Sequence, residues 1–354
     1  MAGGAGTRFW PMSRAEKPKQ FLDILGTGKT LLRQTFERFL PEFAVENFFV
    51  VTNEAYGGLV KEQIPELTNN QILLEPSRKN TAPCIAYACY KIHELNPDAI
   101  IAVASSDHLI LNEDKFKKTI LKTVKSSTHK DALFTIGIMP SRPDTGYGYI
   151  QFEEDEKYPS DKSIFKVKTF TEKPELEMAK FFVQNGDFLW NSGIFVWSSK
   201  AIIDAFEKYQ PEMAALFSEG KERYNTPDEK HLVEQAYHVC KNISVDYAIM
   251  EKANNVFVLG ADFGWSDLGT WGSLYEHSQK SNEGNVISGK NVVLYDTQNC
   301  VVKVPKDKLV VLEGLYGYIV TESDNILLVC RKSEEQQIRQ IVNDIKISKG
   351  EKFV

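Results

Sequence analysis

The chain has 354 residues, of which 42% are hydrophobic and 25% charged, and its formal net charge is -6 at pH 7. This composition is ordinary for a globular protein, and the length favours one large α/β domain with a smaller one attached. The acidic balance argues against a general nucleic-acid binder, and no apolar run is long enough to cross a membrane. We therefore expect a cytoplasmic protein with neither nucleic acid nor membrane as a partner.

The first 21 residues combine glycines with cations. The glycine-rich part is Gly3-Gly4-Ala5-Gly6-Thr7, and the cations are Arg8, Arg14, Lys17 and Lys19. Glycines let backbone N–H groups turn toward one anion, and the cations offset its charge. Phe9 stands where a dinucleotide-binding fingerprint needs its third glycine, so this is a phosphate loop of another kind. A second segment, Gly26-Thr27-Gly28-Lys29-Thr30, lacks the leading glycine of a Walker loop and is interpreted as a turn before a helix.

Short apolar runs alternate with helical patterns through most of the chain. The expected strands are 48–52, 100–104, 133–138, 193–197 and 256–259. The expected helices are 31–40, 82–95, 116–124, 174–183, 201–209, 213–224 and 245–253. This alternation predicts an α/β fold of the Rossmann-like type, with a doubly wound, mixed and mostly parallel sheet.

The texture changes after residues 281–285 to closely spaced strands. These are expected at 291–295, 301–304, 309–312, 318–321 and 326–329, followed by a terminal helix at 334–344. Runs this short suit the coils of a small β-helix or a small sandwich. We therefore divide the chain into an α/β domain at 1–280 and a C-terminal β domain, resembling a short β-helix, at 281–354.

Two aspartates follow predicted strands. Asp107 comes after the strand at 100–104, and Asp267 comes after the strand at 256–259. Ligands of a doubly wound sheet lie beyond the carboxyl ends of its strands, and two carboxylates with phosphate oxygens suit Mg²⁺. On pattern alone, an N-cap or a turn residue is the alternative for Asp107, and a helix N-cap is the simpler interpretation of Asp267.

Four further segments offer polar side chains or glycines that are suited to contact a ligand. Asn80 and Thr81 stand at a predicted helix start, and Gly146 lies in the tyrosine-rich segment 144–150. Glu172 offers an acceptor for hydroxyl groups, and the adjacent Lys173 offers a cation for a phosphate. Asn191 can both donate and accept. Without further information, helix caps and turns explain most of these residues equally well.

The order of these motifs resembles the sugar nucleotidyltransferases. Trp10-Pro11-Met12-Ser13-Arg14, together with Pro18-Lys19-Gln20-Phe21, is similar to the mannose-1-phosphate guanylyltransferase branch, and six motifs follow the family order between residues 3 and 271. The resemblance implies that Arg8, Lys19, Asp107 and Asp267 are catalytic and that the two aspartates bind Mg²⁺. It implies nucleotide binding by Gly3, Gly4, Gly6, Thr7, Arg14, Asn80 and Thr81, and sugar-phosphate binding by Gly146, Glu172, Lys173 and Asn191.

The reaction that the resemblance implies is transfer of GMP from GTP to a sugar-1-phosphate. Mannose 1-phosphate is the expected acceptor, which would place the enzyme in GDP-mannose and polysaccharide biosynthesis. Guanylyl transfer to another sugar phosphate and a catalytically silent nucleotide-sugar-binding paralogue are the alternatives. The family also implies a homodimer. Because only Met1-Ala2 precede Gly3, we expect the first, central strand of the sheet to be missing from this sequence.

Overall fold

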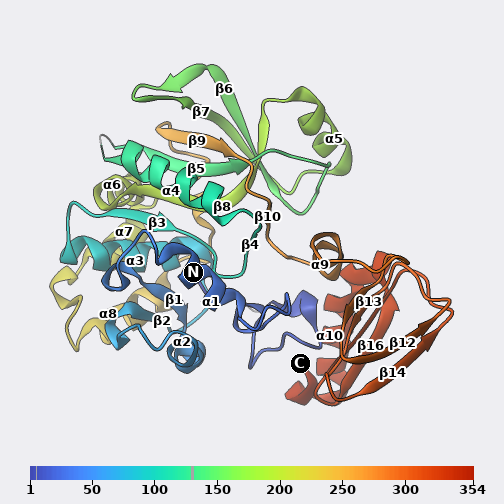
Figure 1. Cartoon of the computed structure of the whole chain (residues 1–354). Coiled ribbons are helices and arrows are strands. Elements are labelled where there is room, and N and C mark those ends of the chain that lie inside the picture. The colour runs from blue at the N-terminus through green and yellow to red at the C-terminus, as the bar shows by residue number, and fades with distance from the viewer. Residues whose placement is uncertain (5, 129–130) are drawn as a thin grey trace. The chain divides into compact units, whose positions relative to one another are not determined.

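The computed structural model describes residues 1–4, 6–128 and 131–354. Packing divides the chain into two compact units, each made of segments that are distant in sequence (Figure 1). Unit 1 comprises residues 1–3, 38–105 and 110–265, and unit 2 comprises residues 4–37, 106–109 and 266–354. The predicted boundary near residue 280 stays a prediction, since it is drawn along the sequence and the two units are defined by packing.

Unit 1 contains most of the α/β elements. Its strands are β1 (Val50–Asn53), β2 (Ile72–Glu75), β3 (Ile100–Val103), β5 (Leu133–Ile138), β6 (Gly148–Tyr158), β7 (Asp161–Glu172), β8 (Phe188–Ser198) and β9 (Val256–Ala261). Its helices are α2 (Gly57–Gln63), α3 (Thr81–Leu95), α4 (Glu113–Ser127), α5 (Leu176–Asn185), α6 (Ser199–Tyr209), α7 (Pro211–Ser218), α8 (Glu229–Val239) and the π-helix η7 (Asp246–Met250). The short strands β4 (Leu109–Ile110) and β10 (Trp265–Ser266) pair, and each has one residue in either unit.

The main sheet of unit 1 is mixed, as expected. Its order is β3-β8-β5-β9-β7-β6, and β1 and β2 form a separate parallel pair. Within the six-stranded sheet β5 and β9 are parallel, whereas the other described pairs are antiparallel. The parallel share is smaller than predicted because β8 inserts antiparallel between β3 and β5, and because the β6–β7 hairpin adds to the edge. The sequence pattern does not report which strand is inserted between two others.

Both faces of this sheet are covered, which is the doubly wound arrangement. On β8, Phe195 and Trp197 belong to a core with α3, α6, α7 and α8, and the alternate residues Ile194 and Val196 belong to a second core with α4 and α5. Successive side chains of a strand point to opposite faces, so one strand contributes to two cores. Figure 1 shows α3 and α8 below β3 and α4 near β5 and β8.

Residues 1–3 belong to unit 1 and form no strand in the described structure. The amino group of Met1 donates to the Ala104 carbonyl at 2.8 Å, and the Ala2 N–H donates to the Val51 carbonyl at 2.7 Å. The first two residues therefore bond both β1, through Val51, and Ala104, the residue directly after β3. The expected absence of a first strand stays a prediction.

Unit 2 combines the phosphate-loop segment with the C-terminal β domain. It holds β11 (Val286–Ser288), β12 (Asn291–Tyr295), β13 (Val301–Lys303), β14 (Leu309–Glu313), β15 (Tyr318–Ser323) and β16 (Ile326–Arg331). Its helices are α9 (Trp271–His277), the 3-10 helix η8 (Lys332–Gln337) and α10 (Ile338–Lys349), and most of α1 (Leu31–Phe39) also lies in it.

The C-terminal strands stack as β-helix coils. β11, β13 and β15 pair in parallel, β12 and β14 pair in parallel, and the antiparallel β16 ends the stack. The five predicted strands are observed as β12 to β16. The terminal helix begins later than expected, at Ile338, after η8. One core of unit 2 joins the two ends of the chain, because Phe9 and Trp10 pack with Trp271, Ile319 and Ile338.

Lys303 on β13 lies against the backbone of residues 23–24, which precede α1. Its ammonium donates to the Ile24 carbonyl at 2.7 Å, and burial lowers its pKa to about 8. In the unfolded chain this lysine titrates at about 10.4. Between these values the unfolded chain holds a proton that the folded protein has lost, so folding stability should rise with pH across that window.

We expect wild type to gain about 1–3 kcal/mol of stability between pH 8 and pH 10.5 relative to Lys303→Met. Urea melts of both proteins at a series of pH values measure this difference. Lys308→Met is the control, because this lysine is half exposed and lies on the same β domain. Parallel pH curves for wild type and Lys303→Met would show that Lys303 does not titrate in this window.

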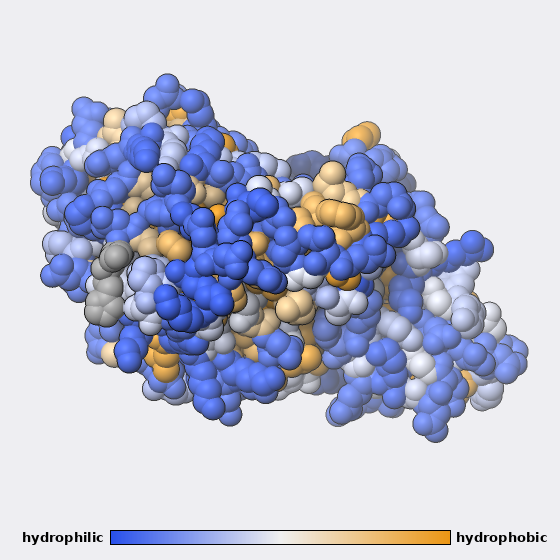
Figure 2. Space-filling model, turned by 90° about the horizontal axis from the view of Figure 1, so that it is seen from above, coloured by the Kyte–Doolittle hydropathy of each residue, from blue (hydrophilic) through white to orange (hydrophobic). Residues whose placement is uncertain are grey.

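Hydrophilic residues predominate on the face seen in Figure 2, with small separate apolar patches among them. A helix with the length and apolarity needed to cross a membrane is absent from the described part of the chain.

Candidate active site

The phosphate-loop segment folds into two short 3-10 helices, η1 (Thr7–Phe9) and η2 (Lys19–Phe21), in unit 2. Gly6 precedes η1 with a φ of +60°, and a Cβ at this position would lie 2.7 Å from Cβ of Lys19. Only glycine fits there, because the conformation and the close approach both exclude a side chain. The amide of Gln20 donates to the Gly4 carbonyl at 2.9 Å, which ties the start of the loop to η2.

Lys19 is the centre of a buried polar cluster. Its ammonium lies 2.8 Å from Oδ2 of Asp107 and donates to the backbone carbonyls of Asp267 at 2.7 Å and Leu268 at 3.1 Å. The Lys19 side chain is 6% exposed, and the Asp107 side chain is 30% exposed. Three acceptors match the three N–H donors of an ammonium, so the lysine joins the predicted carboxylate segments in one place.

Asp107 is kept ionised by its neighbours. Burial by itself would raise the pKa of the Asp107 carboxyl, but the Lys19 ammonium and the imidazole of His108 hold it below its ordinary value. Nε2 of His108 lies 3.9 Å from Oδ1 of Asp107. An ionised carboxylate that is still partly exposed can bind a cation without first losing a proton.

Asp267 lies in a strained turn. Leu268 has a φ of +45°, a conformation that costs a non-glycine residue free energy, and its side chain is fully buried. The turn is held by bonds from the Gly269 N–H to Oδ1 of Asp267 at 2.9 Å and from the Leu268 N–H to Oγ of Ser266 at 3.1 Å. Thr270, and not Asp267, caps α9 through a capping box with Ser273. The N-cap interpretation of Asp267 is therefore wrong.

The other cations of the loop differ in their surroundings. Nε of Arg8 is buried and has no hydrogen-bond partner among the described residues. Arg14 instead bonds the Ser323 carbonyl at 2.8 Å and pairs with Asp324 at 3.0 Å, in the turn between β15 and β16. Arg14 thus binds the β domain, and its nucleotide role stays a prediction. Gly3 lies in unit 1 beside the buried Glu75, and Gly4 and Thr7 lie in unit 2.

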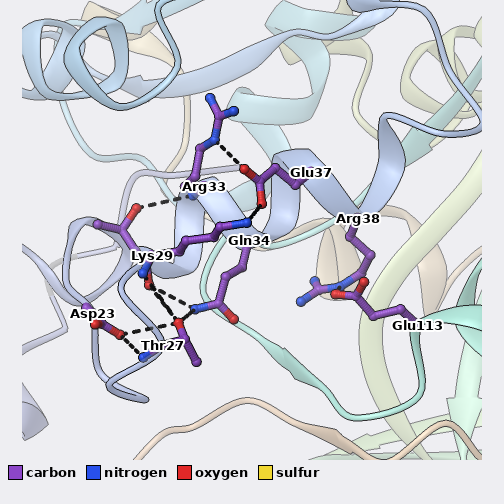
Figure 3. A network of polar contacts seen from close by, with 9 residues as sticks. Asp23, Thr27, Lys29, Arg33, Gln34, Glu37, Arg38 and Glu113 are labelled. Atoms are coloured by element: carbon purple, nitrogen blue, oxygen red, sulfur yellow. Dashed lines mark hydrogen bonds and ion pairs between the residues drawn. The ribbon is translucent and has the colours of Figure 1, made fainter.

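The second glycine-rich segment is a turn before α1, as the sequence predicts (Figure 3). The Asp23 carboxylate accepts from the N–H groups of Thr27 at 2.9 Å and Gly28 at 2.8 Å. Lys29 pairs with Glu37 on α1 at 2.6 Å. These groups are occupied by the protein itself, so the segment is not arranged as a Walker loop.

The start of α3 in unit 1 is fixed by the loop before η7. Oδ1 of Asn80 accepts from the Thr81 N–H at 2.9 Å, and Asn80 has a φ of +69°. Oγ1 of Thr81 accepts from the Val245 N–H at 2.8 Å. Asparagine tolerates a positive φ better than most residues. Of the two predicted nucleotide-binding residues, Asn80 therefore also caps α3, whereas the Thr81 hydroxyl bonds the residue before η7.

Glu172, Lys173 and Asn191 lie together at the ends of β7 and β8 in unit 1. The carboxylate of Glu172 pairs with the ammonium of Lys173, whose φ is +48°. Gly148 is opposite Glu172 in the register, and a Cβ there would collide with that carboxylate and lie 3.4 Å from Cβ of Asn191. The glycine at this cluster is therefore Gly148. The predicted Gly146 instead lies in a turn where its N–H donates to Asp144 at 2.8 Å.

Two family models match almost the whole chain. The model described as Nucleotidyl transferase matches residues 1–284, and the model described as MannoseP isomerase/GMP-like beta-helix domain matches residues 290–345. The mannose-1-phosphate guanylyltransferase of Escherichia coli strain K12 is 36% identical over 98% of this chain and 72% of its own length. The chain belongs to the mannose-1-phosphate guanylyltransferase family of nucleotidyl transferases.

Further relatives agree with this assignment. A mannose-1-phosphate guanylyltransferase of Salmonella typhimurium is 35% identical over 98% of this chain and 72% of its own length. A crystal structure from Thermus thermophilus, titled mannose-1-phosphate geranyltransferase, matches with a TM-score of 0.86 and 27% identity over 98% of both chains. The nucleotidyltransferase fold, the β-helix-like C-terminal domain and the enzymatic class predicted from the sequence are thereby confirmed.

Asp246 is a residue of this nucleotidyl transferase that the sequence reasoning missed. It begins η7, and its Oδ1 accepts from the amide of Asn191 at 2.7 Å. Burial and the nearby Glu172 raise the pKa of its carboxyl, against the effect of the Asn191 amide. The bond orients the side chain of Asn191, whose Oδ1 accepts from the Gly193 N–H at 3.1 Å. The sequence signal was an acidic residue inside a predicted helix, which carries no indication of such a partner.

Proposed function

We infer that this enzyme transfers GMP from GTP to α-D-mannose 1-phosphate and releases pyrophosphate and GDP-mannose. The observation that carries the proposal is the near full-length similarity to two relatives named mannose-1-phosphate guanylyltransferase. The cluster around Lys19 supports it, because it brings Asp107 and the turn of Asp267 together beside a glycine-rich loop. Guanylyl transfer to another sugar phosphate is the neighbouring possibility.

In the proposed reaction an oxygen of the sugar phosphate forms a bond to the α-phosphorus of GTP. The bond between that phosphorus and the oxygen bridging to the β-phosphorus breaks, and pyrophosphate leaves with the electron pair. The sugar phosphate is already ionised at neutral pH, so the step needs no general base. Because both reactants are anions, positioning and positive charge provide most of the catalysis.

We assign the charges as follows. Arg8 and Lys19 offset the charge of the departing pyrophosphate, and Lys173 offsets the charge of the sugar phosphate. The glycines Gly3, Gly4 and Gly6, with Thr7 and the α3 start at Asn80 and Thr81, are the proposed nucleotide-binding groups. Glu172 and Asn191 are proposed to bind sugar hydroxyls, with Gly146 in the neighbouring loop.

Asp107 and Asp267 are the proposed ligands of Mg²⁺. The fit is one of donor chemistry: both groups are carboxylates, Asp107 is ionised and partly exposed, and Mg²⁺ binds one or two carboxylates together with waters and substrate phosphates. When bound, the ion would supply positive charge to the phosphate oxygens.

The proposed homodimer is supported by the exposed apolar side chains Val293, Leu309 and Val311 on the paired strands β12 and β14. Light scattering measures the oligomeric state.

Incubation with GTP, Mg²⁺ and mannose 1-phosphate should release pyrophosphate and yield GDP-mannose, measured by a coupled pyrophosphate assay and chromatography. A panel of glucose, fucose and heptose 1-phosphates ranks the acceptors by kcat/KM. Faster turnover of another sugar phosphate would replace mannose in the proposal. Binding of GDP-mannose without pyrophosphate release from any nucleotide would instead show a silent paralogue.

A further inference from the structure

Glu335 lies in η8, directly after the last strand of the β domain, and belongs to unit 2. Its Oε2 accepts from the Gly272 N–H at 2.6 Å. Thr270 and Gly272 are the N-cap and second residue of α9, the helix that follows the Asp267 turn. A residue of the β domain therefore holds the end of the turn that carries a proposed metal ligand.

The position of Gly272 shows how closely the two segments fit. A Cβ at residue 272 would lie 2.8 Å from Oε1 of Glu335, so any side chain there would displace the carboxylate. The Gly272 N–H is in the first turn of α9, where no backbone acceptor within the helix is available. A carboxylate at a helix N-terminus is also favoured by the helix dipole.

The surroundings of Glu335 act on the pKa of its carboxyl in opposite directions. Burial raises the pKa of the Glu335 carboxyl, while the Gly272 N–H, the Thr270 hydroxyl and the positive charge of Arg8 act to lower it. The segment is anchored close by, because Ile338 is fully buried in the core that contains Phe9 and Trp271. The ring centroids of Phe9 and Trp271 are 5.1 Å apart.

The two ends of the Asp267 turn are thus held by different parts of unit 2. Lys19 bonds the carbonyls of Asp267 and Leu268, and Glu335 accepts from the Gly272 N–H. Leu268 between them has a positive φ, which persists only where the surroundings impose it. A turn of this kind depends on both attachments.

We propose that Glu335 is a positioning residue for nucleotidyl transfer, which holds the Asp267 turn in its reactive arrangement. The proposal rests on the proposed function for its catalytic consequence. The β domain would then contribute to the reaction through one carboxylate. Removing the Glu335 carboxylate and adding a side chain at residue 272 should disturb the same contact.

Glu335→Ala should lower kcat by about 10- to 100-fold, because small displacements of catalytic groups are costly. KM for mannose 1-phosphate should stay within twofold, since Glu172 and Asn191 belong to the other unit. Glu335→Gln keeps an acceptor for the Gly272 N–H and should recover a large part of kcat. Glu334→Ala is the matched control, because Glu334 is exposed on the same segment and should leave kcat unchanged.

A double-mutant cycle isolates the contact. Gly272→Ala should lower kcat in the wild-type background, where its Cβ displaces the carboxylate, and should have little further effect in Glu335→Ala. Additive losses, or a Glu335→Ala kcat within threefold of wild type, would overturn the proposal.

Hydrogen exchange gives a readout that does not require turnover. The Gly272 amide should exchange at least about tenfold faster in Glu335→Ala, and its rate should be unchanged in Glu334→Ala. If wild type releases no pyrophosphate with any nucleotide, the proposed function fails, and exchange at residues 270–273 still tests the contact. Unchanged exchange in Glu335→Ala would overturn the positioning role.

Discussion

Asp107→Asn should reduce pyrophosphate release by at least about 100-fold, because it removes one of two proposed metal-binding carboxylates and a fixed charge at the reacting phosphates. The asparagine keeps the shape of the side chain and one acceptor for Lys19. We therefore expect a small loss of stability, about 1 kcal/mol, given that Asp107 is 30% exposed. Steady-state kinetics and thermal melting separate the two effects.

Asp98→Asn is the control for this substitution, because its side chain is exposed and lies outside the proposed site. Binding of GDP-mannose to Asp107→Asn should remain measurable by calorimetry. Turnover within tenfold of wild type would remove Asp107 from the proposed metal site. Retained binding without turnover would agree with its catalytic role.

Lys19→Met is expected to have the larger effect on the protein as a whole. It leaves the Asp107 carboxylate and the carbonyls of Asp267 and Leu268 without their shared donor. We expect a loss of about 2–4 kcal/mol in stability and at least about 100-fold in kcat. Lys19→Arg should not restore activity, because the Lys19 side chain is almost fully buried and a guanidinium is larger and planar.

Lys17→Met tests whether any cation of the loop has this effect. Lys17 is exposed two residues away, so its removal should change neither the melting temperature nor kcat by a comparable amount. Chemical denaturation and pyrophosphate release measure the pair of variants. Equal effects of the two substitutions would mean that Lys19 contributes only net charge.

Local sequence predicted the elements of the β domain well. The strand expected at 291–295 is observed with the same bounds as β12, and the four predicted strands after it differ by one or two residues, whereas β11 was not predicted. Strands of three to six residues with β-branched side chains between turn residues give a strong local signal. β7 was not predicted, because much of this strand is charged and exposed, and the hairpin it makes with β6 was missed.

The partners of the site residues were not predictable in this way. The sequence indicated Asp107, Lys19 and Asn191, but not that Lys19 would bond the Asp267 turn or that Asp246 would orient Asn191. It gave no reason to pair Arg14 with Asp324 in the β domain. Glu335 lies within the helix expected at 334–344, and the sequence pattern did not indicate its contact with Gly272. Each of these contacts joins residues that are tens to hundreds of positions apart.

The glycine-rich loop with its cations, the two aspartates after strands and the change to short strands near residue 285 were determined by the sequence alone. Spacing and side-chain type carry this information because they act over a few neighbouring residues. Tertiary structure decided the position of β8 between β3 and β5 in the sheet, and it decided which carboxylate accepts from the Gly272 N–H. It also decided that residues 4–37 pack in one unit with residues 266–354. These outcomes depend on burying apolar side chains from distant segments in shared cores, which no local pattern encodes.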